Sequence, residues 1–265
     1  MKYWAFWCFC LLAMGGCSGQ GGPDGTQAEE SAVEETTDEI AQQIIDAAIE
    51  KHGGSKYRDC RVQFNFRDKF YLAIREGSKF QYERIFTDSS GAEIRDVLTS
   101  EGFFREIEGQ RVQLSEKDSS AYANSVNSVI YFALLPYFLN DPAVIKKYAG
   151  EVTIKGKPYQ KVRVTFRREG GGKDFEDEYM YWIHRDEHTM DYLAYNFHVN
   201  GGGARFREAY AFRTSNGIRF ANYHNYKPKA DNRNVAEFDS LFENDGLEKV
   251  SDIELDHVRV VLDYW

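Results

Sequence analysis

Cysteine is scarce in this chain, and three of the four lie close together near one end. Cys8, Cys10 and Cys17 fall within the first 17 residues, which leaves only Cys60 in the rest of the sequence. No internal disulfide can therefore form after Cys17. Cys60 stands just before an alternating, strand-like segment with no paired base signalled nearby. This context predicts a small buried side chain and not a catalytic thiol.

Internal hydrophobic runs are too short to cross a membrane as a helix. The most apolar internal stretch, Val129–Leu139, has 11 residues without a charge or a small polar side chain, whereas a helical span needs about 20. Helical spacing around it predicts a helix, which Pro136 should interrupt or kink. The sequence leaves open whether this helical plug is a static part of the core or a movable lid.

Basic residues are outnumbered, with 33 Lys and Arg against 42 Asp and Glu and a formal net charge of −9. That balance argues against a nucleic-acid partner. Signatures of common catalytic sites are also missing, since there is no G-x-S-x-G motif and the glycine triplets resemble turns more than a phosphate-binding loop. His184 and His188 could be metal ligands across a hairpin, but zinc needs three or four converging ligands. We therefore expect solvated turn residues there, no metal and no cofactor.

The N-terminus has the parts of an export signal. Lys2 precedes an apolar run from Tyr3 to Met14, and small residues follow it. The segment "AMGGC" then resembles the lipobox of bacterial lipoproteins, although Met14 stands where that motif most often has Leu. The resemblance implies a signal peptide over 1–16, cleavage before Cys17 and a lipid on its thiol. The alternative is an ordinary cleaved signal with Cys17 as a bystander.

Residues 17–37 are predicted to form a flexible tether, because they are rich in Gly, Ser, Thr and Glu and have no apolar periodicity. If the resemblance to lipoproteins holds, Ser18 after the lipidated cysteine implies export to the outer membrane of the cell envelope. The lack of an acidic cluster directly after Cys17 favours the periplasmic face. The membrane is then a partner through the N-terminal lipid anchor and not through charge.

Residues 38–265 are predicted to form a single domain. A helix is expected at 36–52, with Thr36 and Glu39 as a capping box and "HGG" as its stop. A second, short helix is expected at 142–149, with Asp141 as N-cap and Pro142 at its first position. Two-residue alternation and turn signals predict antiparallel strands at 61–67, 70–75, 80–86, 92–98, 102–107, 110–114, 151–155, 158–168, 176–184, 190–199, 204–213, 217–226 and 253–262.

This order of elements resembles the LolA/LolB-like superfamily of lipoprotein-localisation proteins. The resemblance implies an α+β fold, in which a strongly curved antiparallel sheet forms a half-barrel around an N-terminal helix and a mid-chain helical plug. The segments "HGGSKY", "NSVNSVIYFALLPYFLNDPAV", "YMYWI" and "MDYLAYNF" also look like an uncharacterised family of bacterial cell-envelope lipoproteins, a domain of unknown function.

Aromatic residues are abundant, with 19 Phe, 17 Tyr and 4 Trp. Some of this content suits ordinary strand packing, but amphipathic rings also line cavities for apolar ligands. We therefore predict a non-catalytic binding or carrier protein for an apolar, lipid-like small molecule. The candidate contact residues are Tyr131, Phe132, Leu135, Tyr137, Phe138 and Trp182.

Two other functions remain open from the sequence. An envelope hydrolase would use His and carboxylate groups of the strands at 176–199, and it requires His184 or His198 to converge with Glu178 in one cleft. A structural or assembly factor would instead present its aromatic residues on the surface to another envelope protein.

Overall fold

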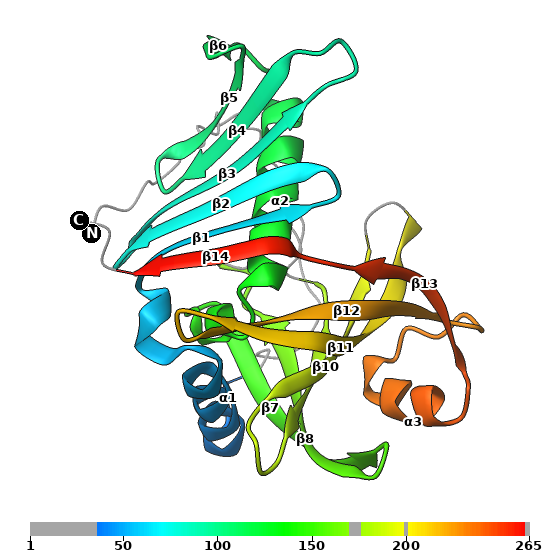
Figure 1. The fold of residues 1–265 in the computed structure, drawn as a ribbon. Helices are drawn as coiled ribbons and strands as arrows, with labels where there is room; N and C mark the ends of the chain where they lie inside the picture. Colours follow the sequence, from blue (N-terminus) through cyan, green and yellow to red (C-terminus); the bar gives the residue numbers. More distant parts are fainter. Residues whose placement is uncertain (1–35, 170–175, 199–200, 263–265) are drawn as a thin grey trace, which may run out of the picture. The chain divides into compact units, whose positions relative to one another are not determined.

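The computed structural model of the chain describes residues 36–169, 176–198 and 201–262 (Figure 1). The predicted signal peptide at 1–16, Cys17 and nearly all of the predicted tether at 17–37 lie outside the described residues, as does the predicted turn at 170–172. Within the described part, no helix has the length and apolar character of a membrane span.

Fourteen strands form two seven-stranded antiparallel sheets. Sheet A has the order β14-β1-β2-β3-β4-β5-β6, and sheet B has the order β13-β12-β11-β10-β9-β8-β7. The strands of sheet A are β1 (Asp59–Phe66), β2 (Lys69–Glu76), β3 (Lys79–Thr87), β4 (Glu93–Thr99), β5 (Gly102–Ile107), β6 (Gln110–Val112) and β14 (Asp256–Leu262). Those of sheet B are β7 (Val144–Ile154), β8 (Lys157–Phe166), β9 (Tyr179–His184), β10 (Met190–Phe197), β11 (Gly203–Ser215), β12 (Ile218–Pro228) and β13 (Leu247–Ile253).

The two sheets adjoin where β13 leads directly into β14, since these consecutive strands are edge strands of different sheets. Asn222 on β12 secures the joint, because its Oδ1 accepts hydrogen bonds from the backbone N–H of Leu255 (3.2 Å) and from Arg213 (2.9 Å). Arg213 also donates to the carbonyl oxygen of Leu255. The result is a curved, open α+β half-barrel, as predicted, and not a closed barrel.

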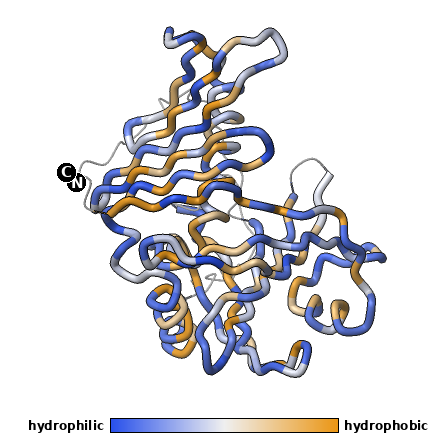
Figure 2. Tube along the Cα trace, in the orientation of Figure 1, coloured by the Kyte–Doolittle hydropathy of each residue, from blue (hydrophilic) through white to orange (hydrophobic). Residues whose placement is uncertain are grey.

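Helix α2 (Glu116–Ala133) lies across the inner face of sheet A (Figure 1). Ser115 caps it by accepting a hydrogen bond from the N–H of Asp118 (3.1 Å). Val126 and Ile130 are fully buried against inward-facing side chains of the sheet, among them Val62, Phe64, Tyr71, Ala73 and Tyr82. Figure 2 shows the strands of sheet A alternating between hydrophobic and hydrophilic residues, the pattern that gives the sheet this apolar inner face.

Helix α1 (Glu39–His52) covers part of the inner face of sheet B together with the 3-10 helix η2 (Tyr137–Asn140). Its N-cap is Asp38, which accepts from the N–H of Ala41 (2.7 Å), so the predicted capping box at Thr36 is wrong. The other Asp38 oxygen accepts from the N–H of Tyr148 on β7 (2.8 Å). Asp38, and not Thr36, is therefore the N-cap, because its carboxylate both caps the helix and binds the backbone of β7. A further 3-10 helix, η1 (Gly54–Tyr57), follows α1.

His52, the last residue of α1, is a neutral link between the helix and sheet B. Its Nε2 accepts a hydrogen bond from the N–H of Met190 (3.1 Å). Burial, with smaller contributions from Arg219 and Lys51, lowers the pKa of His52 to about 3. The imidazole is thus uncharged at neutral pH, with the proton on Nδ1.

A third layer covers the outer face of sheet B. It consists of the 3-10 helix η4 (Val235–Glu237) and helix α3 (Phe238–Glu243), neither of which the sequence pattern predicted. Phe238 and Val235 pack with outward-facing side chains of the sheet, including Trp182 and Phe206. Much of sheet B is therefore buried on both faces, which explains why its strands are so aromatic.

One predicted feature of the mid-chain segment is wrong and another is confirmed. The segment at 142–149 is not a helix, because the residues from Val144 onward belong to β7, which pairs with β8 up to Ile154 and contains a bulge between Tyr148 and Glu151. Sheet pairing here overrides the local capping signal of Asp141 and Pro142. The predicted interruption at Pro136 is confirmed, without a kinked continuous helix, because α2 ends at Ala133 and η2 begins after the proline.

Candidate functional site

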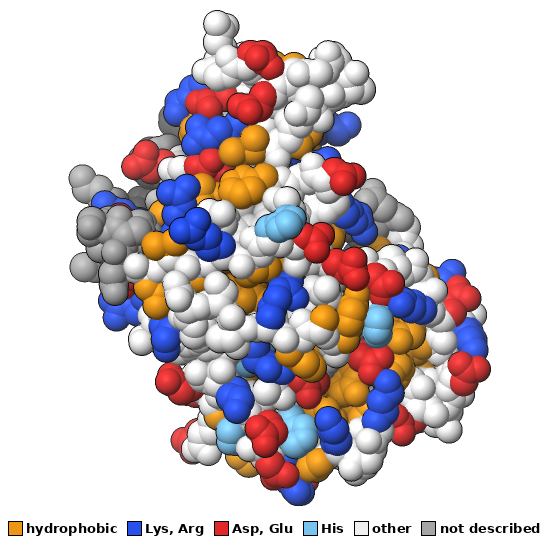
Figure 3. Space-filling model, viewed as in Figure 1, with side chains coloured by type: hydrophobic (Ala, Val, Ile, Leu, Met, Phe, Trp, Pro, Cys, Tyr) orange, Lys and Arg blue, Asp and Glu red, His pale blue; other side chains and the backbone are white. Residues whose placement is uncertain are grey.

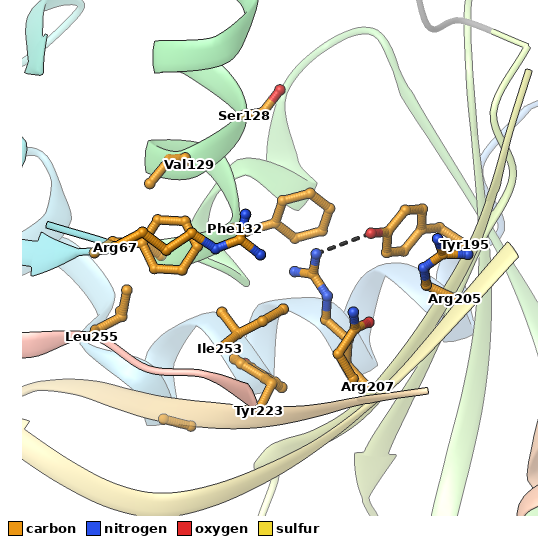
Figure 4. A pocket seen from close by; sticks show the side chains of 14 residues that line it. Arg67, Ser128, Val129, Phe132, Tyr195, Arg205, Arg207, Tyr223, Ile253 and Leu255 are labelled. Atoms are coloured by element: carbon orange, nitrogen blue, oxygen red, sulfur yellow. Dashed lines mark hydrogen bonds between the residues drawn. The ribbon is translucent and has the colours of Figure 1, made fainter. Parts of the chain in front are cut away.

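A cleft of about 380 Å³ lies where α2, the inner face of sheet B and the joint between the sheets come together (Figure 4). Strand β1 of sheet A and the turn after it contribute Phe66 and Arg67. One face of α2 contributes Ser128, Val129, Phe132 and Ala133. The rest of the lining comes from sheet B and the joint, and consists of Tyr195, Arg205, Arg207, Ala221, Tyr223, Asn225, Ile253 and Leu255.

The two faces of α2 explain why a cleft forms there. Val126 and Ile130 point into sheet A, whereas Val129 and Phe132 lie on the side that faces sheet B. Helix α1 and η2 cover much of the inner face of sheet B, including the start of β10 at Met190 and Leu193, but the part that carries Arg205, Arg207 and Asn225 stays uncovered. The cleft is the space left between that part and α2.

The apolar wall of the cleft combines side chains of α2 with others from sheet B and the joint. Val129 and Phe132 face Tyr223, Ile253 and Leu255 across the cleft (Figure 4), and Ala133 also lines it. Burial raises the pKa of Tyr223 to about 12, so this phenol remains neutral at physiological pH. Aromatic and aliphatic linings of this kind are typical of pockets for small apolar ligands.

Arginines supply the polar part of the lining. The guanidinium of Arg207 lies 4.1 Å from the ring centroid of Phe132 and 5.2 Å from that of Tyr195, and it donates a hydrogen bond of 2.9 Å to the Tyr195 hydroxyl. Arg205, two residues earlier on the same face of β11, lies over the ring of Phe197. Arg67 enters from the turn between β1 and β2 (Figure 4).

Carboxylates are missing from the residues that line the cleft. This differs from the general surface, because the face seen in Figure 3 has acidic and basic side chains interspersed. None of the three arginines forms an ion pair with a described carboxylate. The cleft therefore has a positive and an apolar part.

Of the six side chains predicted to contact a ligand, the structure places only Phe132 in the cleft. Tyr131 is stacked on Phe138 with ring centroids 5.3 Å apart, and Leu135 is buried beside α1. Tyr137 stacks on Tyr57 and accepts a hydrogen bond from Arg75 (3.0 Å). These four residues fill the core between the two sheets.

Trp182 lies on the other side of sheet B. It is fully buried in the outer layer, where its ring centroid lies 5.5 Å from that of Phe206 and its indole N–H donates to Asp239 of α3 (3.2 Å). The strand period of two places Tyr181 and Ile183 on the inner face and Trp182 on the outer one. We therefore leave Trp182 out of the candidate site.

The groups required for a hydrolase do not line the cleft either. Glu178 is paired with Arg163 (2.6 Å), and His198 lies 3.5 Å from Asp177. His184 Nδ1 accepts from the backbone N–H groups of Asp186 and Glu187, which closes the tight turn after β9. Within the described ranges, no group of three or more potential metal ligands is found.

Sequence reasoning missed the three arginines, although one signal was present. Arg205 and Arg207 alternate with Ala204 and Phe206 along β11. Without knowledge of the outer layer, the arginines would be assigned to solvent and Phe206 to the core. Since α3 covers the outer face, the arginine face is in fact the inner one, and this becomes visible only once both layers are known.

Comparison with solved structures gives several likenesses at low sequence identity. A LolA superfamily protein from Nitrosomonas europaea is 10% identical over 83% of this chain and 92% of its own, with a TM-score of 0.45. A DUF1329 family protein from Desulfovibrio piger is 11% identical over 84% and 93%, with a TM-score of 0.44. A putative outer membrane lipoprotein-sorting protein domain from Vibrio parahaemolyticus is 8% identical over 84% and 94%, with a TM-score of 0.43.

No curated protein matches the chain. A family match covers nearly all of the described residues, and it agrees with the expected resemblance to an uncharacterised family. Residues 35–255 match the family of unknown function DUF6503, and the chain belongs to that family.

Proposed function

We propose that this protein is a non-catalytic carrier that reversibly binds an apolar, lipid-like molecule in the cleft between α2 and sheet B. One observation carries the proposal: the uncovered stretch of sheet B and the free face of α2 enclose about 380 Å³ with an apolar wall. Burial of a hydrocarbon chain there would contribute roughly 25 cal/mol for each Å² of apolar surface removed from water.

The position of Phe132 supports this proposal. The ring stands between the α2 wall and Arg207, and its neighbours Tyr195 and Tyr179 have centroids 5.4 and 6.4 Å away. It is partly exposed, whereas the core residues around Ile130 are fully buried. A side chain of this size left half-uncovered beside a cavity is a suitable contact for an apolar ligand.

The binding proposal predicts that a bulky residue at the cleft blocks the ligand. Ser128 and Asn127 are adjacent, exposed residues of α2, and only Ser128 lines the cleft. We expect Ser128→Trp to abolish most of the binding of a fluorescent fatty acid, while the matched variant Asn127→Trp binds like the wild-type chain. Fluorescence titration of the full chain carrying Cys17→Ser measures this, and thermal melts check that both variants are equally folded.

Organic extracts of the gently purified chain give an independent readout, because a carrier should copurify with its ligand. Mass spectrometry that detects no lipid, together with no displacement of the fluorescent fatty acid, would exclude the proposal. Equal binding by the two tryptophan variants would place the ligand somewhere other than this cleft.

We also propose that a lipid on Cys17 anchors the protein to the periplasmic face of the outer membrane. The support is the resemblance of residues 13–17 to a lipobox. We expect the mature N-terminal peptide to begin at Cys17 and to gain the mass of its acyl groups, and Cys17→Ala to lose both features. Mass spectrometry of the chain from membrane fractions checks this, and an unmodified Cys17 would contradict it.

A further inference from the structure

The cleft contains more positive charge than a purely apolar ligand would need. Arg67, Arg205 and Arg207 line it, and no lining residue is acidic, although the whole chain has a net charge of −9. Like charges that face one space repel each other, and burial makes the charge of Arg207 costly unless an anion is present. None of the described lining residues supplies the negative group that would balance these positive charges.

The guanidinium of Arg207 is buried and already oriented to bind such a group. The residue is only 9% exposed, and its Nε is buried without a hydrogen-bond partner among the described residues. The Tyr195 hydroxyl accepts from one terminal nitrogen, and the rings of Phe132 and Tyr195 lie against the guanidinium. The aromatic contacts and this one hydrogen bond fix the orientation of the group, so that little side-chain entropy would be lost when an anion binds.

Arg67 approaches the same space from the opposite side. Figure 4 shows its guanidinium and that of Arg207 both directed into the cleft, one from the turn after β1 and the other from sheet B. The backbone of Arg67 has a positive φ of 49°, and its guanidinium lies 5.0 Å from the ring centroid of Phe66. The tight turn and the adjacent ring thus position a second cation across from the first.

We propose that the cleft takes an anionic, single-chain amphiphile, whose carboxylate or phosphate head lies between Arg67 and Arg207. The hydrocarbon chain of the ligand then lies against Val129, Phe132 and Ile253. This proposal rests on the proposed carrier function, because it names the ligand class of the same cleft. Guanidinium groups suit it chemically, since they donate paired hydrogen bonds to carboxylates and phosphates.

A neutral lipid would fit the apolar wall but would leave the charge of Arg207 without a carboxylate or phosphate partner. A cationic amphiphile would add a further positive charge to the three already present. Hydrogen bonds to charged groups contribute about 1.5–3 kcal/mol, which corresponds to a difference in affinity of about ten-fold or more between an anionic and a neutral head on the same chain.

The test compares probes that share one hydrocarbon chain and differ in the head. Dodecanoate, dodecyl phosphate, dodecan-1-ol and dodecyltrimethylammonium are titrated at pH 8, below their micelle concentrations, into the full chain carrying Cys17→Ser. We expect the anions to bind about ten-fold or more tightly than the alcohol, and the cation to bind most weakly. A preference between the two anions also supports the proposal and identifies the head as fatty-acid-like or phospholipid-like.

A matched pair of arginine variants links the preference to the cleft. Arg67 and Arg61 are both exposed and lie at or on β1, but only Arg67 lines the cleft. We expect Arg67→Gln to weaken anion binding and leave dodecan-1-ol binding unchanged, whereas Arg61→Gln changes neither. Arg207→Gln should have the larger effect, and because Arg67 is exposed, its variant still decides the question if the buried substitution impairs folding.

Two outcomes separate failure of this inference from failure of the carrier function. If the alcohol binds as tightly as the anions, or if Arg67→Gln leaves anion binding unchanged, the anionic head is wrong while the apolar carrier stands. If no probe binds with any head, both proposals fall together.

Discussion

Replacing Asp96 with Asn is expected to lower the free energy of unfolding by about 3–5 kcal/mol, because it leaves the buried Arg84 and the largely buried Arg105 without their counter-charge. Asp96 is fully buried on the inner face of sheet A. Its Oδ2 accepts from Arg84 (2.6 Å), and its Oδ1 accepts from Arg105 (2.6 Å). Urea-induced unfolding of the wild-type and variant chains measures the difference.

The same carboxylate also positions one wall of the cleft. Arg84 donates to the Ser125 hydroxyl on α2 (2.7 Å), and Arg105 lies 3.7 Å from the ring centroid of Tyr122 on the same helix. Asp96 therefore holds the two arginines that fasten the middle of α2 to sheet A. We expect the variant to bind amphiphiles more weakly even under conditions where it remains folded.

An exposed aspartate provides the control for this prediction. Asp245 pairs with Lys229 at 2.8 Å, but its side chain is 93% exposed. Exposed ion pairs contribute little to stability, so Asp245→Asn should unfold at the same urea concentration as the wild-type chain. Equal effects of the two substitutions would show that the Asp96 network does not hold α2 in place.

The period of two along the chain was enough to predict most of the sheet strands. The β5 strand was predicted with the bounds that the structure has, and β4 differs by one residue. These strands alternate because one face packs on α2 and the other meets solvent. Sheet B was harder to predict, since β7 follows residues that resemble a helix start, Asp141 and Pro142. The segment pairs with β8 and does not form a helix.

The candidate site could be predicted only in part. The apolar stretch pointed to α2, but not to which of its faces would stay uncovered, and only Phe132 of the six expected contacts lines the cleft. The assignment of Trp182 to the inner or the outer face of sheet B requires knowledge of η4 and α3, which cover the outer face. These two helices are short and have no clear periodicity in the sequence. Inner and outer faces of a strand cannot be told apart by alternation alone when both are buried.

Trp182 and Phe132 should therefore have opposite effects when each is truncated. We expect Trp182→Ala to lower the free energy of unfolding by about 3–5 kcal/mol, because it opens a cavity between sheet B and α3 and removes one hydrogen-bond donor to Asp239. Amphiphile binding should stay at the wild-type level at low temperature, where the variant remains folded, since the residue faces away from the cleft. Urea unfolding and fluorescence titration on the same sample measure both quantities.

Phe132→Ala is the counterpart, because that side chain is partly exposed and lies in the cleft. It should lose most of the amphiphile binding with a smaller loss of stability, since less apolar surface leaves a packed environment. Trp182→Phe keeps most of the ring packing, so it tests the outer layer if the alanine variant is too unstable to assay. Loss of binding in a folded Trp182 variant, without loss of stability, would mean that the ligand reaches the outer face of sheet B and that the cleft is not the site.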